Sequence, residues 1–259
     1  MPLPVEKKKP SVDLWNYTIL LYGESKIGKS TLLSQIPNVL FLNTGGGLEA
    51  IECFEQPITT WEEFLEAGKD IIEGKHKFKV IAIDTVDRLA KYCTNYMMKK
   101  LDITHPQDLG YGKGYDLVKD EFMRPFMKLS LSSYGLIVVS HAVATEIQTR
   151  TAKITKFVPS MQPFMYNVIA PVCGITLYYD TAETEHGETR ILRTRISEKW
   201  IAGDRTGKLE AHGDIEILPL PINNWDRIQQ IFEGKLRLRK ENNVIPSPTK
   251  NKGLGFLGK

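Results

Sequence analysis

The sequence has few cysteines, no long apolar run and no strong net charge. Its three cysteines stand far apart, without a C-x-x-C pair or a histidine at metal spacing, so we expect reduced thiols rather than disulfides or a zinc site. No segment reaches the roughly 18 consecutive apolar residues of a membrane helix, and residues 1–9 lack the apolar core of a secretory signal. These absences predict a cytoplasmic protein with no membrane partner.

The composition is that of an ordinary globular chain, but the positive charge gathers at the ends. The 259 residues are 42% hydrophobic and 25% charged, enough to build one α/β domain. Residues 235–259 hold seven Lys or Arg against one acid. We therefore expect a basic, flexible segment over 1–13, a core over 14–234 and a basic, disordered tail over 235–259. The tail is either a solubility feature or an arm for nucleic acid or a partner.

The most informative segment is a glycine-rich loop with the spacing G-x-x-x-x-G-K-[ST] at residues 23–30. Gly23 and Gly28 are expected to take positive φ, so that backbone N–H groups surround a phosphate. Lys29 would bind the β- and γ-phosphates, and Ser30 would bind Mg²⁺. A chance glycine-rich turn is the alternative. The predicted ATP-binding residues are Gly23, Glu24, Ser25, Lys26, Ile27, Gly28, Lys29, Ser30 and Thr31.

Strand-like and helix-like patterns alternate around this loop. Apolar strands are expected over 17–22, 38–43, 78–84 and 135–141, and helices over 60–72, 86–100 and 115–131. This alternation predicts an α/β fold with a mostly parallel central sheet flanked by helices. Later strands, over 174–179, 188–196 and 214–218, are expected to extend one edge in antiparallel fashion, before a last helix over 224–232.

Two polar residues end apolar strands and are candidate catalytic groups. Asp84 is expected to share the Mg²⁺ ion with Ser30, the alternative being a simple cap at a strand end. Asp87, one helical turn further, is the weaker candidate. His141 is expected beside the γ-phosphate as a sensor. The alternative is a structural histidine in the core whose hydrogen bonds are satisfied there.

Two segments have the composition of a nucleic-acid contact. After His141, residues 146–157 are basic and interleaved with Thr and an aromatic residue. This composition suits a flexible segment that contacts the phosphates along a single strand of DNA or RNA. An ordinary hairpin with solvated lysines is the alternative. The loop over 109–114 is the second segment. The predicted DNA-binding residues are Tyr111, Lys113, Gln148, Arg150, Lys153, Lys156 and Phe157.

Cations also follow a late strand, over residues 197–207. In ATPases that assemble side by side, Lys199 or Arg205 would reach the γ-phosphate of a neighbouring subunit and stabilise transition-state charge. A surface salt bridge is the alternative.

These pieces together resemble phage-encoded P-loop ATPases of the RecA-like type, in particular the short, core-only single-strand annealing group. The resemblance covers residues 15–220 and depends on five segments in order. They are Gly23–Thr31, Asp84-Thr85, the stretch D-L-G-Y-G-K-G at 108–114, Ser140-His141, and A-G-D-R-T-G at 202–207.

The resemblance implies a RecA-like core, ATP and Mg²⁺ as cofactors, and single-stranded DNA bound by the loops before and after the His141 strand. It also implies rings or filaments with ATP sites between subunits, a single-stranded-DNA-binding protein as partner, and a place in the host cytoplasm. His141 matches the family's sensor, and Lys199 and Arg205 lie near its trans-acting cations.

One position departs from the family pattern. Such ATPases carry a glutamate after the second strand to polarise the attacking water, and Gly45 occupies that place here. Glu49, four residues on, is a possible substitute. Loss of the base would lower the rate by about 10²–10⁴, so we expect ATP binding with weak hydrolysis.

The leading hypothesis is an ATP-dependent, single-stranded-DNA-binding recombination or annealing protein in which ATP switches assembly and DNA binding. A nucleotide-gated regulatory protein without a DNA role is the main alternative. A small-molecule kinase is a third, disfavoured because the sequence has no arginine-rich lid.

Overall fold

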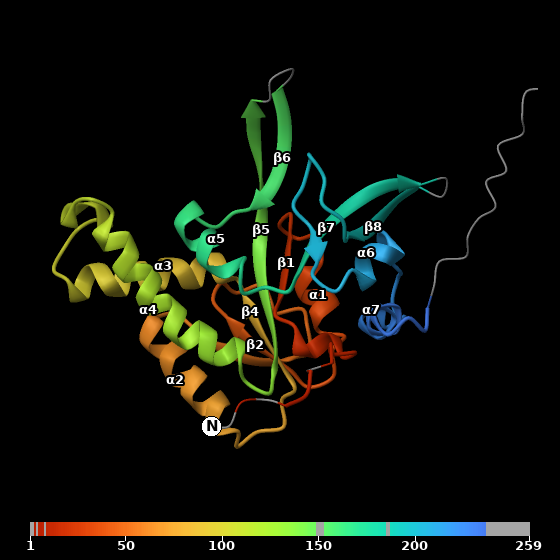
Figure 1. The fold of residues 1–259 in the computed structure, drawn as a ribbon, viewed down its shortest axis with the longest axis horizontal. Coiled ribbons are helices and arrows are strands. Elements are labelled where there is room, and N and C mark those ends of the chain that lie inside the picture. Colours follow the sequence, from red (N-terminus) through yellow and green to blue (C-terminus); the bar gives the residue numbers. More distant parts are fainter. Residues whose placement is uncertain (1–2, 4, 8, 149–152, 185–186, 237–259) are drawn as a thin grey trace, which may run out of the picture.

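A twisted ten-stranded sheet runs through the molecule, and helices cover both of its faces (Figure 1). The computed structural model describes residues 3, 5–7, 9–148, 153–184 and 187–236. In the described part, the order of the main strands is β10-β8-β7-β1-β5-β4-β2-β3. The predicted α/β fold with a mostly parallel central sheet is confirmed.

Apart from the exposed edge strand over 54–57, the parallel centre is built from apolar strands buried on both faces, as their sequences require. Its members are β1 (Ile19–Gly23), β2 (Val39–Asn43), β3 (Phe54–Pro57), β4 (Val80–Asp84), the first half of β5 (Gly135–Gln148) and β7 (Ile175–Thr184). Because these strands are parallel, Gly23, Asn43, Asp84 and His141 all end at the same edge of the sheet.

The later strands only partly follow the expected antiparallel arrangement. β8 (Gly187–Arg193), β9 (Gly203–Asp204) and β10 (Ile215–Ile217) are antiparallel to their neighbours, as expected. The expectation is wrong for β7, which runs parallel to β1. The reason is α5 (Pro163–Ile169), a short helix before β7 that the sequence pattern did not reveal.

Side chains alternate between two hydrophobic cores, one on each face of the sheet. Leu20 faces α5 and the helices α2 (Trp61–Glu73), α3 (Val86–Lys100) and α4 (Lys113–Ser130). Ile19 and Leu21 face α1 (Lys29–Leu33), α6 (Lys208–His212) and α7 (Asn224–Phe232). Two 3₁₀ turns, η1 (Leu14–Asn16) and η2 (Pro106–Leu109), complete the described elements.

A hairpin projects beyond the sheet where a flexible segment was expected (Figure 1). β5 continues past His141 to Gln148, and β6 (Lys153–Pro159) pairs with it antiparallel from Ala142↔Pro159 to Gln148↔Lys153. β-branched residues on both legs favour the strands. The expectation of flexibility is therefore wrong for the described legs, and the hairpin alternative fits.

Near the predicted start of the core at residue 14, the N-terminal part of the chain contacts the last part of the core. Ser11 accepts hydrogen bonds from Tyr17 and Lys208 through its carbonyl, and Leu14 donates to Gln229. Of the predicted tail, Lys235 and Leu236 alone fall within the described residues. Among the described helices, none is long and apolar enough to cross a membrane.

Candidate functional site: a phosphate-binding cavity at the carboxyl edge of the sheet

A cavity of about 320 Å³ opens at the carboxyl edge of the parallel strands. Residues predicted at separate places in the sequence meet there. Its walls include the phosphate loop, the loop after β2, the end of β4, the start of α3 and His141. The site that the sequence predicted is therefore assembled by the strand order.

The glycine-rich loop has the predicted form, but its two glycines act differently. Gly28 has φ +107°, and Lys26 has φ +65°, so the turn needs left-handed backbone at those two positions. The expected positive φ at Gly23 is wrong. Gly23 is a strand residue, and a Cβ there would lie 2.5 Å from the carbonyl oxygen of Tyr179. Its glycine allows β1 and β7 to approach each other.

Lys29 is buried and folded back onto its own loop. Its Nζ donates to the carbonyl oxygens of Gly23 (2.9 Å) and Glu24 (2.7 Å). Burial lowers the pKa of this ammonium below its ordinary value. No carboxylate of the described chain forms an ion pair with it. A buried cation without an anionic partner is a site for an anion.

Ser30 and Asp84 lie together as the predicted metal pair. The Ser30 hydroxyl donates to Oδ2 of Asp84 at 2.6 Å. Burial raises the pKa of the Asp84 carboxyl, although this hydrogen bond and the charge of Lys29 oppose the shift. A hydroxyl and a carboxylate in contact are the oxygen ligands that Mg²⁺ uses beside phosphates. These residues fit Mg²⁺–ATP.

His141 lies beside Lys29, with Nδ1 of the imidazole 3.5 Å from Nζ. Burial, followed by the charge of Lys29, lowers the pKa of His141. The lowered pKa favours the neutral imidazole, and His141 lines the cavity, as expected for a residue beside the γ-phosphate.

Asp87 fixes the two legs of the hairpin rather than a metal. Its carboxylate accepts from the hydroxyls of Ser140 (2.7 Å) and Ser160 (2.9 Å) and from the backbone N–H of His141 (3.1 Å). The N–H of Ser160 also donates to the carbonyl of His141 at 2.8 Å. One carboxylate thus holds the beginning and the end of the projecting hairpin beside His141.

Two arginines at the cavity were missed by the sequence reasoning. Arg88 lines the cavity next to Gly45, where a Cβ would lie 3.3 Å from three atoms of the Arg88 side chain. Arg190 reaches from β8 towards the loop, with Nη1 3.1 Å from a Cβ built at Gly28. Neither belongs to a local motif, so no sequence signal marks them. Glu49 is fully exposed, bound to the N–H of Gly47, and is not among the residues lining the cavity.

The two candidate trans-acting cations lie outside this cavity and far from each other along the sheet. The carbonyl of Lys199 accepts from Phe157 at 2.8 Å, which places Lys199 at the base of the hairpin. Arg205 donates from its N–H to Gly174 and from its guanidinium to Pro171. Its position, before the start of β7, is the amino edge of the sheet, opposite the phosphate loop.

The predicted nucleic-acid residues are divided between a loop and the hairpin. Tyr111 is fully exposed with φ +46°, and Lys113 begins α4. On the hairpin, cross-strand pairing puts Gln148, Lys153 and Phe157 on one face and Lys156 on the other. Arg150 lies outside the described residues.

Phe157 already has a stacking partner within the protein. Its half-buried ring stacks on Tyr178 at 5.8 Å, and Tyr178 stacks on Tyr22 at 4.8 Å. The Tyr22 hydroxyl in turn bonds to the backbone of Phe157 and Ile201. This aromatic cluster supports the base of the hairpin beside the phosphate loop.

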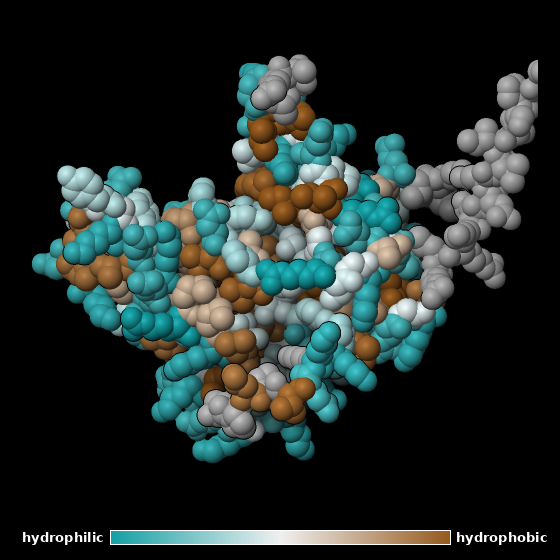
Figure 2. Space-filling view, in the orientation of Figure 1, coloured by the Kyte–Doolittle hydropathy of each residue, from teal (hydrophilic) through white to brown (hydrophobic). Residues whose placement is uncertain are grey.

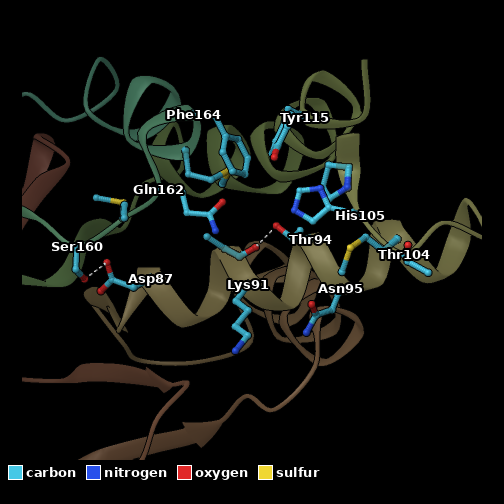
Figure 3. Close-up of a pocket in the computed structure, with 15 residues that line it drawn as sticks. Asp87, Lys91, Thr94, Asn95, Thr104, His105, Tyr115, Ser160, Gln162 and Phe164 are labelled. Carbon is cyan, nitrogen blue, oxygen red and sulfur yellow. Dashed lines mark hydrogen bonds between the residues drawn. The ribbon is translucent and has the colours of Figure 1, made fainter. Parts of the chain in front are cut away.

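A second cavity, of about 420 Å³, is lined by α3, η2, the first turn of α4 and the segment from Ser160 into α5. Figure 3 shows Asp87 and Ser160 at one end of it and His105, Tyr115 and Phe164 at the other. Asp87 therefore borders this groove and the hairpin at once, because its bond to Ser160 lies in the wall.

Comparison with known proteins identifies the family. A family described as "AAA domain" matches residues 15–206, which include the phosphate loop, Asp84, His141 and Arg88. A relative named "SPbeta prophage-derived uncharacterized protein YorG", from Bacillus subtilis (strain 168), is 28% identical over 130 residues. That alignment covers 48% of this chain and 40% of the relative, so the chain spans less than half of the relative's length. Because the family match covers most of the chain, the protein belongs to the AAA-domain family of P-loop proteins, whose fold indicates nucleotide binding.

Proposed function

We propose that this protein is a phage-associated ATPase of the short RecA-like annealing or recombination type, in which bound ATP and Mg²⁺ control the binding of single-stranded DNA. The observation that carries the proposal is the joint position of His141, which borders the phosphate cavity and begins the projecting part of β5. The match to a prophage-derived protein supports the phage association.

The cavity fits ATP and Mg²⁺ through the groups that line it. The loop around Gly28 would hold the β-phosphate with backbone N–H groups, and Lys29 would neutralise the terminal phosphates. Ser30 and Asp84 would hold Mg²⁺, which neutralises charge on the phosphates when bound. Since Gly45 carries no base, we expect slow hydrolysis.

Coupling to the hairpin follows from a short chain of contacts. A phosphate drawing Lys29 away from its loop carbonyls would change the environment of His141, 3.5 Å away. The N–H of His141 shares the carboxylate of Asp87 with Ser160, at the end of the other leg. A change at the imidazole therefore reaches both legs of the hairpin through one side chain.

The hairpin and the exposed loop over 109–114 would contact the single-stranded DNA. Lys153 is exposed near the hairpin tip, and Tyr111 is exposed in the loop between η2 and α4. Lysines contribute phosphate contacts, and an aromatic ring offers a stacking surface for a base. The second cavity lies next to this loop, because His105 and Tyr115, which flank the loop in the chain, line it.

Assembly is a further part of this proposal. Lys199 or Arg205 would reach the ATP of a neighbouring copy in a ring or filament, since neither lines the cavity of its own chain. A single-stranded-DNA-binding protein would then be a partner on the same DNA.

Fluorescence anisotropy with labelled single-stranded DNA tests the proposal. We expect binding to tighten with a non-hydrolysable ATP analogue and Mg²⁺. The Lys153→Gln/Lys156→Gln variant should reduce the slope of log K against log salt by about 1.4, because each phosphate contact contributes about 0.7 for a single strand.

The matched control is Lys69→Gln/Lys75→Gln, which removes the same charge from exposed side chains in α2 and just after it. It should keep the wild-type slope. Absence of DNA binding in every nucleotide state would reject the DNA role.

A second candidate is a nucleotide-gated protein-interaction role without DNA. The hairpin face that carries Lys156 also exposes Val143 and Ile147, at 42% and 40% of their surfaces. Figure 2 shows hydrophobic side chains on the projecting hairpin. Binding of a protein partner there would change little with salt, whereas DNA binding would weaken steeply.

A further inference from the structure

Arg88 occupies the space that Gly45 leaves open in the phosphate cavity. A Cβ at Gly45 would lie 3.3 Å from Cδ, Nε and Cζ of Arg88, so the side chain lies directly over the glycine. Contacts this close are tighter than ordinary van der Waals packing, and even an alanine would require Arg88 to shift. The absence of a side chain at position 45 thus permits this placement of the guanidinium.

The backbone holds this arrangement from both sides. Asn43 accepts from the N–H groups of Gly45 (3.0 Å) and Gly46 (2.9 Å) through Oδ1. Thr44 and Thr85 exchange hydrogen bonds of 2.7 and 2.8 Å, which join this loop to the start of α3. The loop is therefore tied to the turn from which Arg88 arises.

The guanidinium of Arg88 is available for a ligand. Within the described residues it makes no hydrogen bond and no ion pair, although Asp87 precedes it in the chain and Asp84 lies in the same cavity. Both carboxylates are occupied by serine hydroxyls. Successive helix residues point about 100° apart, so Asp87 turns to the hairpin while Arg88 turns to the cavity.

We propose that Arg88 is a ligand of the terminal phosphate, so that the site distinguishes a nucleoside triphosphate from a diphosphate. This inference rests on nucleotide binding in the proposed function and names the group that reads the third phosphate. The loop N–H groups serve the β-phosphate, Ser30 serves the metal, and Lys29 lies between the β- and γ-phosphates. Arg88 and His141 border the same cavity and are placed to meet a group beyond them. Arginine forms two parallel hydrogen bonds to phosphate oxygens, which a lysine does not.

Calorimetric titration with Mg²⁺–ATP analogue and with Mg²⁺–ADP tests the proposal. For Arg88→Gln we expect the affinity for the triphosphate to fall about 10- to 100-fold, as for the loss of a charge-assisted hydrogen bond, and the affinity for ADP to change less than about threefold. Arg88→Lys should be intermediate. Lys99→Gln, in the last turn of the same helix, is the control and should match the wild type.

Gly45→Ala supplies an independent test, because Gly45 does not have the left-handed φ that would make alanine strained. Its methyl group should displace Arg88 and lower the preference for triphosphate. Added to Arg88→Gln, it should cause no further loss, since the two changes act on one interaction.

Equal losses for ATP and ADP in Arg88→Gln, or no loss for either, would overturn the role of Arg88 while leaving nucleotide binding intact. Absence of ATP binding by the wild type would instead reject the proposed function itself. The two failures are thus distinguishable.

Discussion

The Nζ of Lys29 lies 3.5 Å from Nδ1 of His141, although 112 residues separate them in the chain. The parallel pairing of Gly23 with His141 produces this contact, since it brings the ends of β1 and β5 together. Burial is the largest cause of the lowered pKa of the imidazole, and the charge of the Lys29 ammonium is the next. The titration of His141 therefore depends on the charge of Lys29.

Lys29→Ala should weaken ATP binding at least about 100-fold, because it removes the buried cation that meets the terminal phosphates. The same change should raise the pKa of His141, since one of the causes of its depression is lost. Calorimetry measures the first effect, and an NMR titration of the histidine ring measures the second. An unchanged imidazole titration would contradict the coupling.

The stability of the wild type should fall on acidification through the range below the ordinary pKa of histidine, 6.5. The folded state binds a proton at His141 less readily than the unfolded chain, so protons favour unfolding there. Urea unfolding at a series of pH values measures this contribution. It should be smaller in His141→Gln, which cannot titrate.

Asp84→Asn should stabilise the ligand-free protein and abolish the stabilisation by Mg²⁺–ATP. Burial raises the pKa of Asp84 above its ordinary value of 3.8, so its carboxylate costs stability as pH rises through that window, and asparagine avoids this cost. The wild type should gain about 2.7 kcal/mol at a ligand concentration of 100 Kd.

Thermal unfolding of Asp84→Asn with and without Mg²⁺–ATP measures both effects: the higher stability of the free protein and the loss of stabilisation by the ligand. A variant that is both less stable alone and still stabilised by the ligand would show that Asp84 is a structural cap.

Asp87→Ala should destabilise the protein by about 2–4 kcal/mol and loosen the hairpin selectively. Three donors lose their common charged acceptor, and Ser140 among them is fully buried. Hydrogen exchange should accelerate in both legs, over 142–148 and 153–159, more than in β1.

Asp116→Ala is the matched control for Asp87→Ala, since this aspartate lies in the first turn of α4 in an exposed pair with Lys119. Its cost should stay below about 1 kcal/mol. Equal exchange in the two variants would argue against a clamp at Asp87.

Gly23→Ala should destabilise by about 1–3 kcal/mol, because its Cβ would meet the backbone carbonyl of Tyr179 at 2.5 Å and force β1 and β7 apart. Gly68→Ala is the control of opposite sign. It lies within α2 with nothing within 4 Å of the new Cβ, so alanine should stabilise by about 0.5–1 kcal/mol. Urea unfolding distinguishes the two.

Local patterns predicted the elements that have strong local causes. α2 begins at the expected place, where Thr60 accepts from the N–H of Glu63, and α3 covers the expected range from Val86 to Lys100. The apolar strands and the phosphate loop were also predicted, because burial on both faces and the G-x-x-x-x-G-K-S spacing are written in consecutive residues. The closeness of Ser30 and Asp84 also followed from the strand that Asp84 ends, while their binding of Mg²⁺ stays a prediction.

What the sequence did not reveal depends on contacts between distant residues. The role of Gly23 is set by Tyr179, the position of Arg88 by the missing side chain at Gly45, and the direction of β7 by the short helix α5. The sequence predicts a flexible segment after His141 because polar, basic residues are usually exposed to water. Pairing between its two legs, which no single leg displays, orders them.

A single strand, β5, has its first six residues in the buried sheet and its remainder in the hairpin, with His141 at the boundary. The seven steps from His141 to Gln148 span about 23 Å at the rise of an antiparallel strand. If the hairpin tilted by about 5° about His141, its tip would move by about 2 Å. Displacements too small to rearrange the core would thereby be magnified at the outermost end of the molecule.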